Sequence, residues 1–379
     1  MNRWLPVLLL LLATATAPAE PALRLELTGP PVPAIADARP GCDADDIPDA
    51  PARAIRTASG DTLLFATHFR NRVEHGPDLL HVRHRCQIVM RGAENDDPAA
   101  YDDRAWVASL WTPDGVTVYA VIHNEFQGHR RPALCPTGRY MDCWFNALTA
   151  AVSHDEGMTF HRMPSPALVA ELPYRYDQVG LGHHGYFNPS NIVTLADTHY
   201  MFAFATRTQA QREGNCLLRT TAIQSPETWR AWAGSGFDVA FLNPYRQTVS
   251  PEAHVCAPVD PAVLRWPVTS LVRHQPSGLF IATMQDTGRG GGVYYATSPD
   301  LLTWTGPARL VSAFGGGGWT CGDPPPIAYP SLLDPASQDR NFETVGDSAL
   351  LFVTRLNIKY CTISMDRQLM RRNLRIISP

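Results

Sequence analysis

Five short apolar segments are spread along the sequence, and each is too short to form an ordinary buried helix. They are rich in aromatic and β-branched residues and occupy residues 62–67, 117–122, 200–205, 279–283 and 349–354. Near-continuous apolarity over such short lengths is typical of strands covered on both faces. Long helices are disfavoured further by 33 prolines and 27 glycines. The pattern therefore predicts an all-β protein.

Turn signals surround these segments in a repeated order. Hairpin-type turns precede three of them, at residues 58–61, 113–115 and 275–278. A further β-type run follows and ends in a Ser/Asp/Pro turn with an aromatic residue, at residues 153–160, 225–229 and 298–304. Five units of about 65 residues each predict a five-bladed β-propeller.

The predicted domain organisation has three parts. Residues 1–19 are predicted to be a signal peptide, because Arg3 precedes an apolar run and small residues follow it. Residues 20–44 are predicted to be an extended N-terminal lead-in, and residues 45–379 a single propeller domain. The protein is accordingly predicted to be secreted or periplasmic. Its basic residues are almost all arginines, Lys359 being the one lysine, which indicates a high-GC bacterial genome.

The eight cysteines are predicted to form disulfides in such an oxidising compartment. Cys135 and Cys143 flank a Pro-Thr-Gly turn and are predicted to pair with each other, whereas the other pairings stay open. No cysteines have the C-x-x-C spacing of a structural zinc site. We predict no metal and no cofactor.

Charge and motif content exclude several functional classes. A net charge of −4 gives no reason to expect a nucleic acid or membrane partner. The glycine-rich stretches lack the lysine and the strand–helix context of a phosphate-binding loop, and no G-x-S-x-G elbow of a serine hydrolase is present. The class of substrate must therefore be inferred from the residues around the expected binding site.

Propeller geometry predicts where that substrate binds. Residues just before the first strand and just after the second strand of each blade converge around the axis, where a pocket is expected. The predicted substrate-binding residues are His68, Arg70, His123, Asn124, His129, His184, Tyr186, Asn188, Arg207 and Arg355. A collar of this kind fits a sugar, and an acidic sugar in particular, because arginine pairs bidentately with a carboxylate.

Three motifs give the chain a resemblance to a known group. The sequence Ser-Pro-Asp-Leu-Leu-Thr-Trp at 298–304, the Asp-box pattern at 153–160 and the opening segment 49–60 resemble five-bladed glycoside hydrolases of the arabinanase, xylosidase and invertase superfamily. The resemblance implies hydrolysis of a glycosidic bond. The chain departs from the pattern at Asn188, where an acidic residue is expected, and at Glu213, whose Glu-Gly pair lies after the second strand of its blade.

Glycoside hydrolysis requires two carboxyl groups flanking the bond. Blade position and the resemblance make Asp49 the predicted base or nucleophile. Glu125 is the predicted acid, because it lies in the dense polar cluster 123–129. Asp286 or Glu213 is predicted to orient or tune this pair.

Two alternatives remain open from the sequence. A polysaccharide lyase would use Tyr186 as acid, His123 or His184 as base and Arg207 to neutralise a uronate. A glycan-binding propeller without catalysis would use the same collar for recognition alone.

Overall fold

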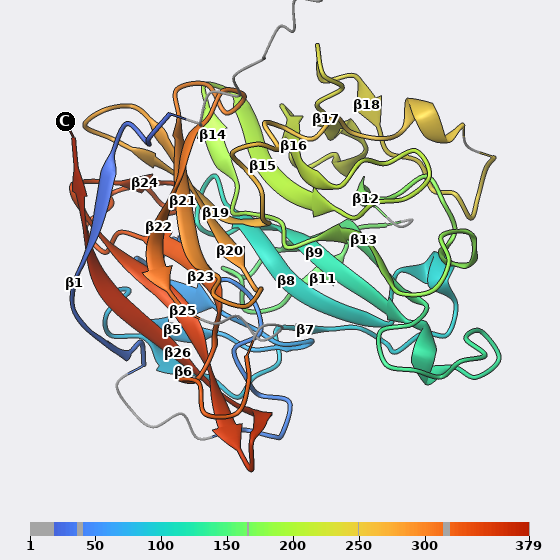
Figure 1. Cartoon of the computed structure of the whole chain (residues 1–379), viewed down its shortest axis with the longest axis horizontal. Helices are drawn as coiled ribbons and strands as arrows, with labels where there is room; N and C mark the ends of the chain where they lie inside the picture. The colour runs from blue at the N-terminus through green and yellow to red at the C-terminus, as the bar shows by residue number, and fades with distance from the viewer. Residues whose placement is uncertain (1–18, 36–40, 165–166, 249, 314–318, 379) are drawn as a thin grey trace, which may run out of the picture.

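The computed structural model describes residues 19–35, 41–164, 167–248, 250–313 and 319–378 (Figure 1). Within these ranges the chain is all-β: its only helices are short 3-10 turns, and none is long and apolar enough to cross a membrane. Apart from Ala19, the predicted signal peptide at 1–19 lies outside the described residues.

The first and the last strands lie in one sheet. This four-stranded sheet has the order β1 (Arg24–Pro33), β26 (Thr362–Ile377), β25 (Ser348–Lys359) and β23 (Ile327–Leu333). Figure 1 shows β1, in blue, beside the red strand β26. The N-terminal segment predicted as a lead-in thus adds a strand to the C-terminal sheet and joins the two ends of the chain.

Three further sheets and one ribbon complete the fold. One sheet has the order β2 (Arg53–Arg56), β3 (Thr62–Phe65), β5 (Glu74–Gly76) and β6 (Arg83–His84), and the ribbon pairs β4 (Arg70–Asn71) with β7 (Met90–Arg91). Another has the order β22 (Thr305–Ser312), β21 (Gly292–Ser298), β20 (Phe280–Asp286), β19 (Val268–His274) and β24 (Thr344–Val345).

The largest sheet combines two antiparallel runs. The first run contains β8 (Arg104–Trp111), β9 (Val118–Gln127) and β10 (Trp144–Ser153), with β11 (His161–Arg162) and β12 (Leu168–Ala170) attached to β10. The second contains β13 (His183–Phe187), β15 (Thr198–Ala205), β16 (Gly214–Thr220), β17 (Arg230–Ala231) and β18 (Val239–Ala240), with β14 (Val193–Leu195) attached to β15. Parallel pairing of β10 with β13 joins the runs.

The five apolar segments all form strands, as predicted. They lie in β3, β9, β15, β20 and β25, and each of these strands is mostly buried. Their side chains fill the hydrophobic clusters between neighbouring sheets. Burial on both faces explains why the segments are apolar without alternation.

The Ser/Asp turns have the structural role that the sequence indicates. In the first, Ser153 donates to Asp155, whose carboxylate accepts from the backbone and hydroxyl of Thr159. In the turn at 298–304, Asp300 accepts from the backbone N–H groups of Leu302 and Thr303. The aromatic residues that follow these turns are buried, so the turns anchor the outer strands.

All eight cysteines are paired. The predicted Cys135–Cys143 disulfide is confirmed, and it closes the loop between β9 and β10. The other pairs are Cys42–Cys86, Cys216–Cys256 and Cys321–Cys361. These pairings involve residues 40 or more positions apart, which is why spacing alone left them open.

Arg53 connects the inner strands of several sheets. Its buried guanidinium donates to the carbonyl oxygens of Ala108 at 3.0 Å, Pro189 at 2.9 Å and Thr269 at 2.8 Å. The hydroxyl of Thr269 in turn donates to the carbonyl of Pro330 at 2.7 Å. Burial lowers the pKa of Arg53 to about 9, so the carbonyl dipoles only partly replace the water that the guanidinium has lost.

We expect Arg53→Met to lower the free energy of unfolding by about 3 kcal/mol or more, because three buried carbonyl groups lose their donor. Chemical unfolding followed by tryptophan fluorescence, with the disulfides intact, measures the change. Arg219→Met is the control, since Arg219 is exposed on β16 and its guanidinium lies over the Phe237 ring. A loss no larger than that of the control would contradict the role given to Arg53.

Candidate active site

A pocket lies directly over the residues that Arg53 holds together. Its lining residues are Asp49, Ala50, Pro51, Trp106, Ala108, His123, Glu125, Asn188, Pro189 and Tyr329. They come from the segment before β2 and from β8, β9, β23 and the segment after β13. The pocket has an empty volume of about 380 Å³, part of which is open solvent at its mouth.

Asp49 is held as a hydrogen-bond acceptor on one side of this pocket. The hydroxyl of Tyr329 donates to Asp49 Oδ1 at 3.0 Å, and the guanidinium of Arg367 donates to the same oxygen. His68 Nε2 lies 3.7 Å from the other carboxylate oxygen. Burial and the Asp49 charge raise the pKa of Tyr329 well above its usual value, so this hydroxyl stays protonated and continues to donate.

Glu125 is in a different electrostatic state. Its side chain is 13% exposed, and Gln127 Nε2 donates to its Oε2 at 2.8 Å. Burial raises the pKa of Glu125 to about 8, with smaller contributions from the charges of Asp49 and Asp103, while the Gln127 hydrogen bond opposes the shift. At neutral pH the Glu125 carboxyl therefore carries a proton that it can donate.

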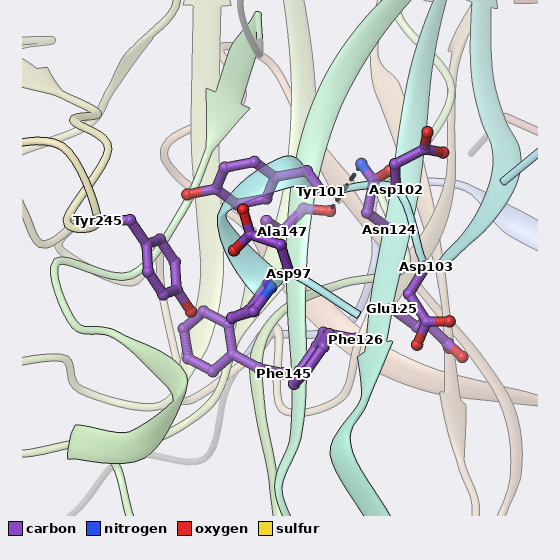
Figure 2. A pocket seen from close by; sticks show the side chains of 11 residues that line it. Asp97, Tyr101, Asp102, Asp103, Asn124, Glu125, Phe126, Phe145, Ala147 and Tyr245 are labelled. Atoms are coloured by element: carbon purple, nitrogen blue, oxygen red, sulfur yellow. Dashed lines mark hydrogen bonds between the residues drawn. The ribbon is translucent and has the colours of Figure 1, made fainter. Parts of the chain in front are cut away.

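Asp103 lies behind Glu125, in a second and narrower cavity. Figure 2 shows both carboxyl groups in the same corner of this cavity, with the rings of Tyr101, Phe145 and Tyr245 on its other side. Arg131 donates to both oxygens of Asp103, at 2.8 and 2.9 Å. On the same measure as the pocket above, this cavity is smaller, with an empty volume of about 290 Å³ against about 380 Å³.

His123 is a neutral residue at the pocket. The side-chain Nδ2 of Asn146 donates to His123 Nε2. The side-chain Oδ1 of Asn146 accepts from His183 Nε2 at 3.2 Å. Burial lowers the pKa of His123 to about 4, and burial together with the neighbouring histidines lowers that of His183 to about 3. The Nε2 lone pair of His123 is thus occupied, and its basicity is low.

The structure places five of the predicted residues in or beside the pocket. Asp49, Glu125, His123 and Asn188 line it, and His68 contacts Asp49 and packs its ring edge against Trp106. Trp106 also contacts His123, so one indole ring separates the two histidines. Of these residues, His123 and Glu125 lie two positions apart in β9, so their side chains share one face of that strand.

Two predicted binding residues point away from the pocket: Asn124, because alternate residues of a strand point to opposite faces, and Tyr186, because its ring packs in the core. Asn124 lies inside its sheet, where it donates to Thr149 at 2.7 Å and accepts from Arg162 at 2.9 Å. Tyr186 has no exposed surface and packs in the core, with its hydroxyl 3.4 Å from Gln211. Neither side chain lines the pocket.

The other predicted residues lie around the pocket or away from it. Arg70 pairs with Asp43 at 3.3 Å, His184 Nε2 donates to the Leu181 carbonyl at 3.0 Å, and His129 stacks on Trp144. Arg355 donates to Asn357 at 2.9 Å, and Asp286 accepts from the Gly288 backbone at 2.9 Å. Arg207 and Glu213 are exposed. None of these seven lines the pocket.

Two residues hold Asp49. Tyr329 lies in β23, ahead of the apolar segment 349–354, where blade geometry favours a side chain near the axis. Arg367 lies in β26, 318 positions from Asp49 in the sequence, and no local pattern connects the two residues.

One group of metal-type ligands lies close together within the described part of the chain. It consists of Cys42, His84 and Cys86, with ligand atoms within 4.8 Å of one another. The two sulfur atoms are joined to each other in a disulfide, so neither is a thiolate that could bind a metal ion.

Comparisons with known proteins identify the fold. No protein-family model matches the sequence, and no curated protein matches it. Among solved structures, the GH43_1 enzyme from Xanthomonas citri complexed with xylotriose matches with a TM-score of 0.51 and 14% identity, over 90% of this chain and 89% of that chain. The alpha-L-arabinofuranosidase from Podospora anserina in complex with cellotriose matches with a TM-score of 0.51 and 10% identity, over 94% and 98%. The chain therefore shares its fold with these two enzymes, which agrees with the fold that the resemblance implies.

We expect Glu125→Gln to stabilise the protein at neutral pH. The folded-state pKa of Glu125 is raised to about 8, so above its ordinary value of 4.5 the unfolded chain releases this proton while the folded protein keeps it. Stability is therefore lost as pH rises from about 4.5 to 8, and glutamine removes the loss. Urea unfolding at pH 7 should give a gain of about 1–3 kcal/mol, shrinking toward zero at pH 4.

Glu213→Gln is the control for that measurement, because Glu213 is exposed. A gain at pH 7 that persists unchanged at pH 4 would contradict a raised pKa for Glu125. A comparable gain in the control would attribute the effect to net charge.

Proposed function

We propose that this protein is a glycoside hydrolase in which Glu125 is the general acid and Asp49 is the base or nucleophile. One observation carries the proposal: two carboxyl groups line the same pocket in opposite electrostatic settings. Glu125 is buried with a raised pKa, and Asp49 is paired with a cation. Pairs of carboxyl groups whose environments separate their roles are characteristic of glycosidase sites.

In the proposed reaction, Glu125 transfers its proton to the glycosidic oxygen as the bond to the departing sugar breaks. Asp49 assists on the opposite side, either by removing a proton from the attacking water or by attacking the sugar itself. The hydrogen bonds from Tyr329 and Arg367 keep the Asp49 oxygen oriented between turnovers. The Asp103 charge behind Glu125 helps to keep that carboxyl protonated.

The lyase alternative has weaker support. Its proposed acid, Tyr186, is enclosed in the core, and its proposed bases are both engaged, His123 with Asn146 and His184 with the Leu181 carbonyl. Arg207, the group proposed to neutralise a uronate, does not line the pocket. We therefore retain the hydrolase.

A binding disc without catalysis also has weaker support. Recognition of a sugar does not require a buried carboxyl group with a raised pKa, and such a group lowers stability at neutral pH. A catalytic acid does require one. The Glu125 environment thus favours turnover.

We propose a neutral oligosaccharide as the first substrate class to test. The prediction of an acidic glycan rested on a collar of arginines, but Arg70, Arg207 and Arg355 do not line the pocket, and Arg367 is neutralised by Asp49. The relatives in fold are described in complexes with xylotriose and cellotriose, which are neutral sugars. Oligosaccharides of these types are therefore suitable probes.

We also propose that the sheets form a single five-bladed propeller domain in a secreted or periplasmic bacterial protein. The blades would be the sheets that begin with β2, β8, β13, β19 and β23, with β1 completing the last one. Four disulfides support an oxidising compartment, and cleavage after residue 19 of the predicted signal peptide would leave β1 intact.

We expect Glu125→Gln and Asp49→Asn each to lower kcat by about 10²–10⁴-fold on a glycan that the wild type cleaves, because each removes one carboxyl role. A panel of neutral and acidic glycans, read by new reducing ends and by near-ultraviolet absorbance, identifies the substrate. For the wild type, kcat/KM should fall as pH rises through about 8, since Glu125 then loses its proton.

Glu213→Gln and Asp286→Asn are the matched controls, because both carboxyl groups lie outside the pocket lining. Each control should keep kcat within about twofold of the wild type. An absorbance gain from an unsaturated product would replace the hydrolase with the lyase. Full activity in either pocket variant would remove that residue from the mechanism.

A further inference from the structure

The loop between β9 and β10 carries an exposed aromatic ring beside the pocket. It begins at η2 (Gly128–Arg130) and is closed at its ends by the Cys135–Cys143 disulfide and by the hydrogen bond from Gly128 N to the Cys143 carbonyl, 3.0 Å. In Figure 1 it extends from the far end of β9. Arg131 anchors it through Asp103 and Asp96, at 2.8 and 2.7 Å. The loop is thus fixed directly to the residue behind Glu125.

Tyr140 lies on this loop and is 74% exposed. Its ring meets Trp144 edge-on, with centroids 5.5 Å apart, and meets His129 edge-on at 5.3 Å. Trp144 and His129 stack on each other at 5.4 Å. An aromatic ring supported by two others loses little conformational freedom when a ligand packs on its exposed face.

A row of rings connects Tyr140 to the pocket. Trp144 contacts His183 at 4.9 Å, His183 contacts Phe187 at 4.2 Å, and Phe187 contacts His123 at 6.0 Å. His123 lines the pocket. The charges of Glu125 and Asp49 also contribute, after burial, to a raised pKa of Tyr140. Both carboxyl groups are therefore within electrostatic reach of its hydroxyl.

Two buried polar atoms in this cluster lack a hydrogen-bond partner among the described residues. They are Trp144 Nε1 and His129 Nδ1. Buried polar atoms almost always have a partner, so an enclosed bridging water is expected behind the exposed ring of Tyr140.

We propose that Tyr140, Trp144 and His129 form a second sugar-binding subsite, which holds the part of an oligosaccharide that extends out of the catalytic pocket. This inference rests on the proposed function, which makes the pocket the first subsite. The apolar C–H face of a pyranose packs on the exposed ring of Tyr140, which Trp144 and His129 support from behind. The disulfide keeps this ring cluster at a fixed distance from Glu125.

Binding measured without turnover tests the subsite separately from the catalytic roles. Xylotriose and xylose are titrated by calorimetry into Glu125→Gln and into Glu125→Gln/Tyr140→Ala. Loss of the ring should weaken xylotriose binding about five- to tenfold, because the trisaccharide reaches the loop. Binding of xylose, which fits within the pocket, should change by less than about twofold.

Two further variants control for folding and for the nature of the contact. Tyr140→Phe in the same background should bind xylotriose within about twofold of its parent, because the ring supplies the contact. Arg139→Ala is the matched loop control, since its exposed guanidinium pairs with Asp142 on the same loop, and it should leave both sugars unchanged.

Equal xylotriose affinity with and without Tyr140, an equal loss for both sugars, or no xylotriose binding by the parent would each overturn the subsite. A failure of the catalytic proposal would give a different result. The wild-type protein would then bind xylotriose through Tyr140 but cleave no glycan.

Discussion

The arrangement of the whole site depends on one buried cation without a carboxylate partner. Arg53 donates to backbone carbonyls of Ala108, Pro189 and Thr269, which belong to different antiparallel runs. Ala108 and Pro189 also line the pocket, so the atoms that Arg53 holds form part of its floor. Carbonyl oxygens with no other donor would be costly in so buried a position, and the guanidinium satisfies several at once. The fold and the pocket therefore share one anchoring interaction.

The ends of the chain contribute to the chemistry as well as to the closure of the fold. Strand β1 pairs with β26, and β26 carries Arg367, which reaches Asp49 just ahead of β2. The ion pair thus joins the last strand of the chain to the segment before the first strand of the next sheet. In the proposed mechanism the paired carboxylate of Asp49 acts as base or nucleophile, whereas Glu125 keeps its proton because burial outweighs the opposing hydrogen bond from Gln127. Long-range closure thereby sets the difference between the two carboxyl groups.

The sequence allowed the strands to be predicted better than the site. Apolar runs and Ser/Asp turns are local patterns, so the strands around residues 62–67 and the turn at Ser153 could be read directly. Site residues depend in addition on which face of a strand they occupy. Asn124 and Glu125 are adjacent and have similar surroundings in the sequence, yet only the second lines the pocket, because a shift of one residue reverses the face. Arg367 could not be predicted at all, since its partner is 318 positions away.

The residues around Glu125 explain where the chain departs from the glycoside hydrolases that its sequence resembles. Asn188 lines the pocket where an acidic residue was expected, and Glu213 and Asp286 lie outside the lining. The third carboxylate near the pair is instead Asp103, whose charge adds to the burial that raises the pKa of Glu125. Arg131 binds Asp103 through two hydrogen bonds and also ties down the loop that carries Tyr140. A change in this ion pair would therefore alter the pKa of Glu125 and the position of the aromatic cluster together. Under the proposed function, this links the strength of the acid to the binding of a longer sugar.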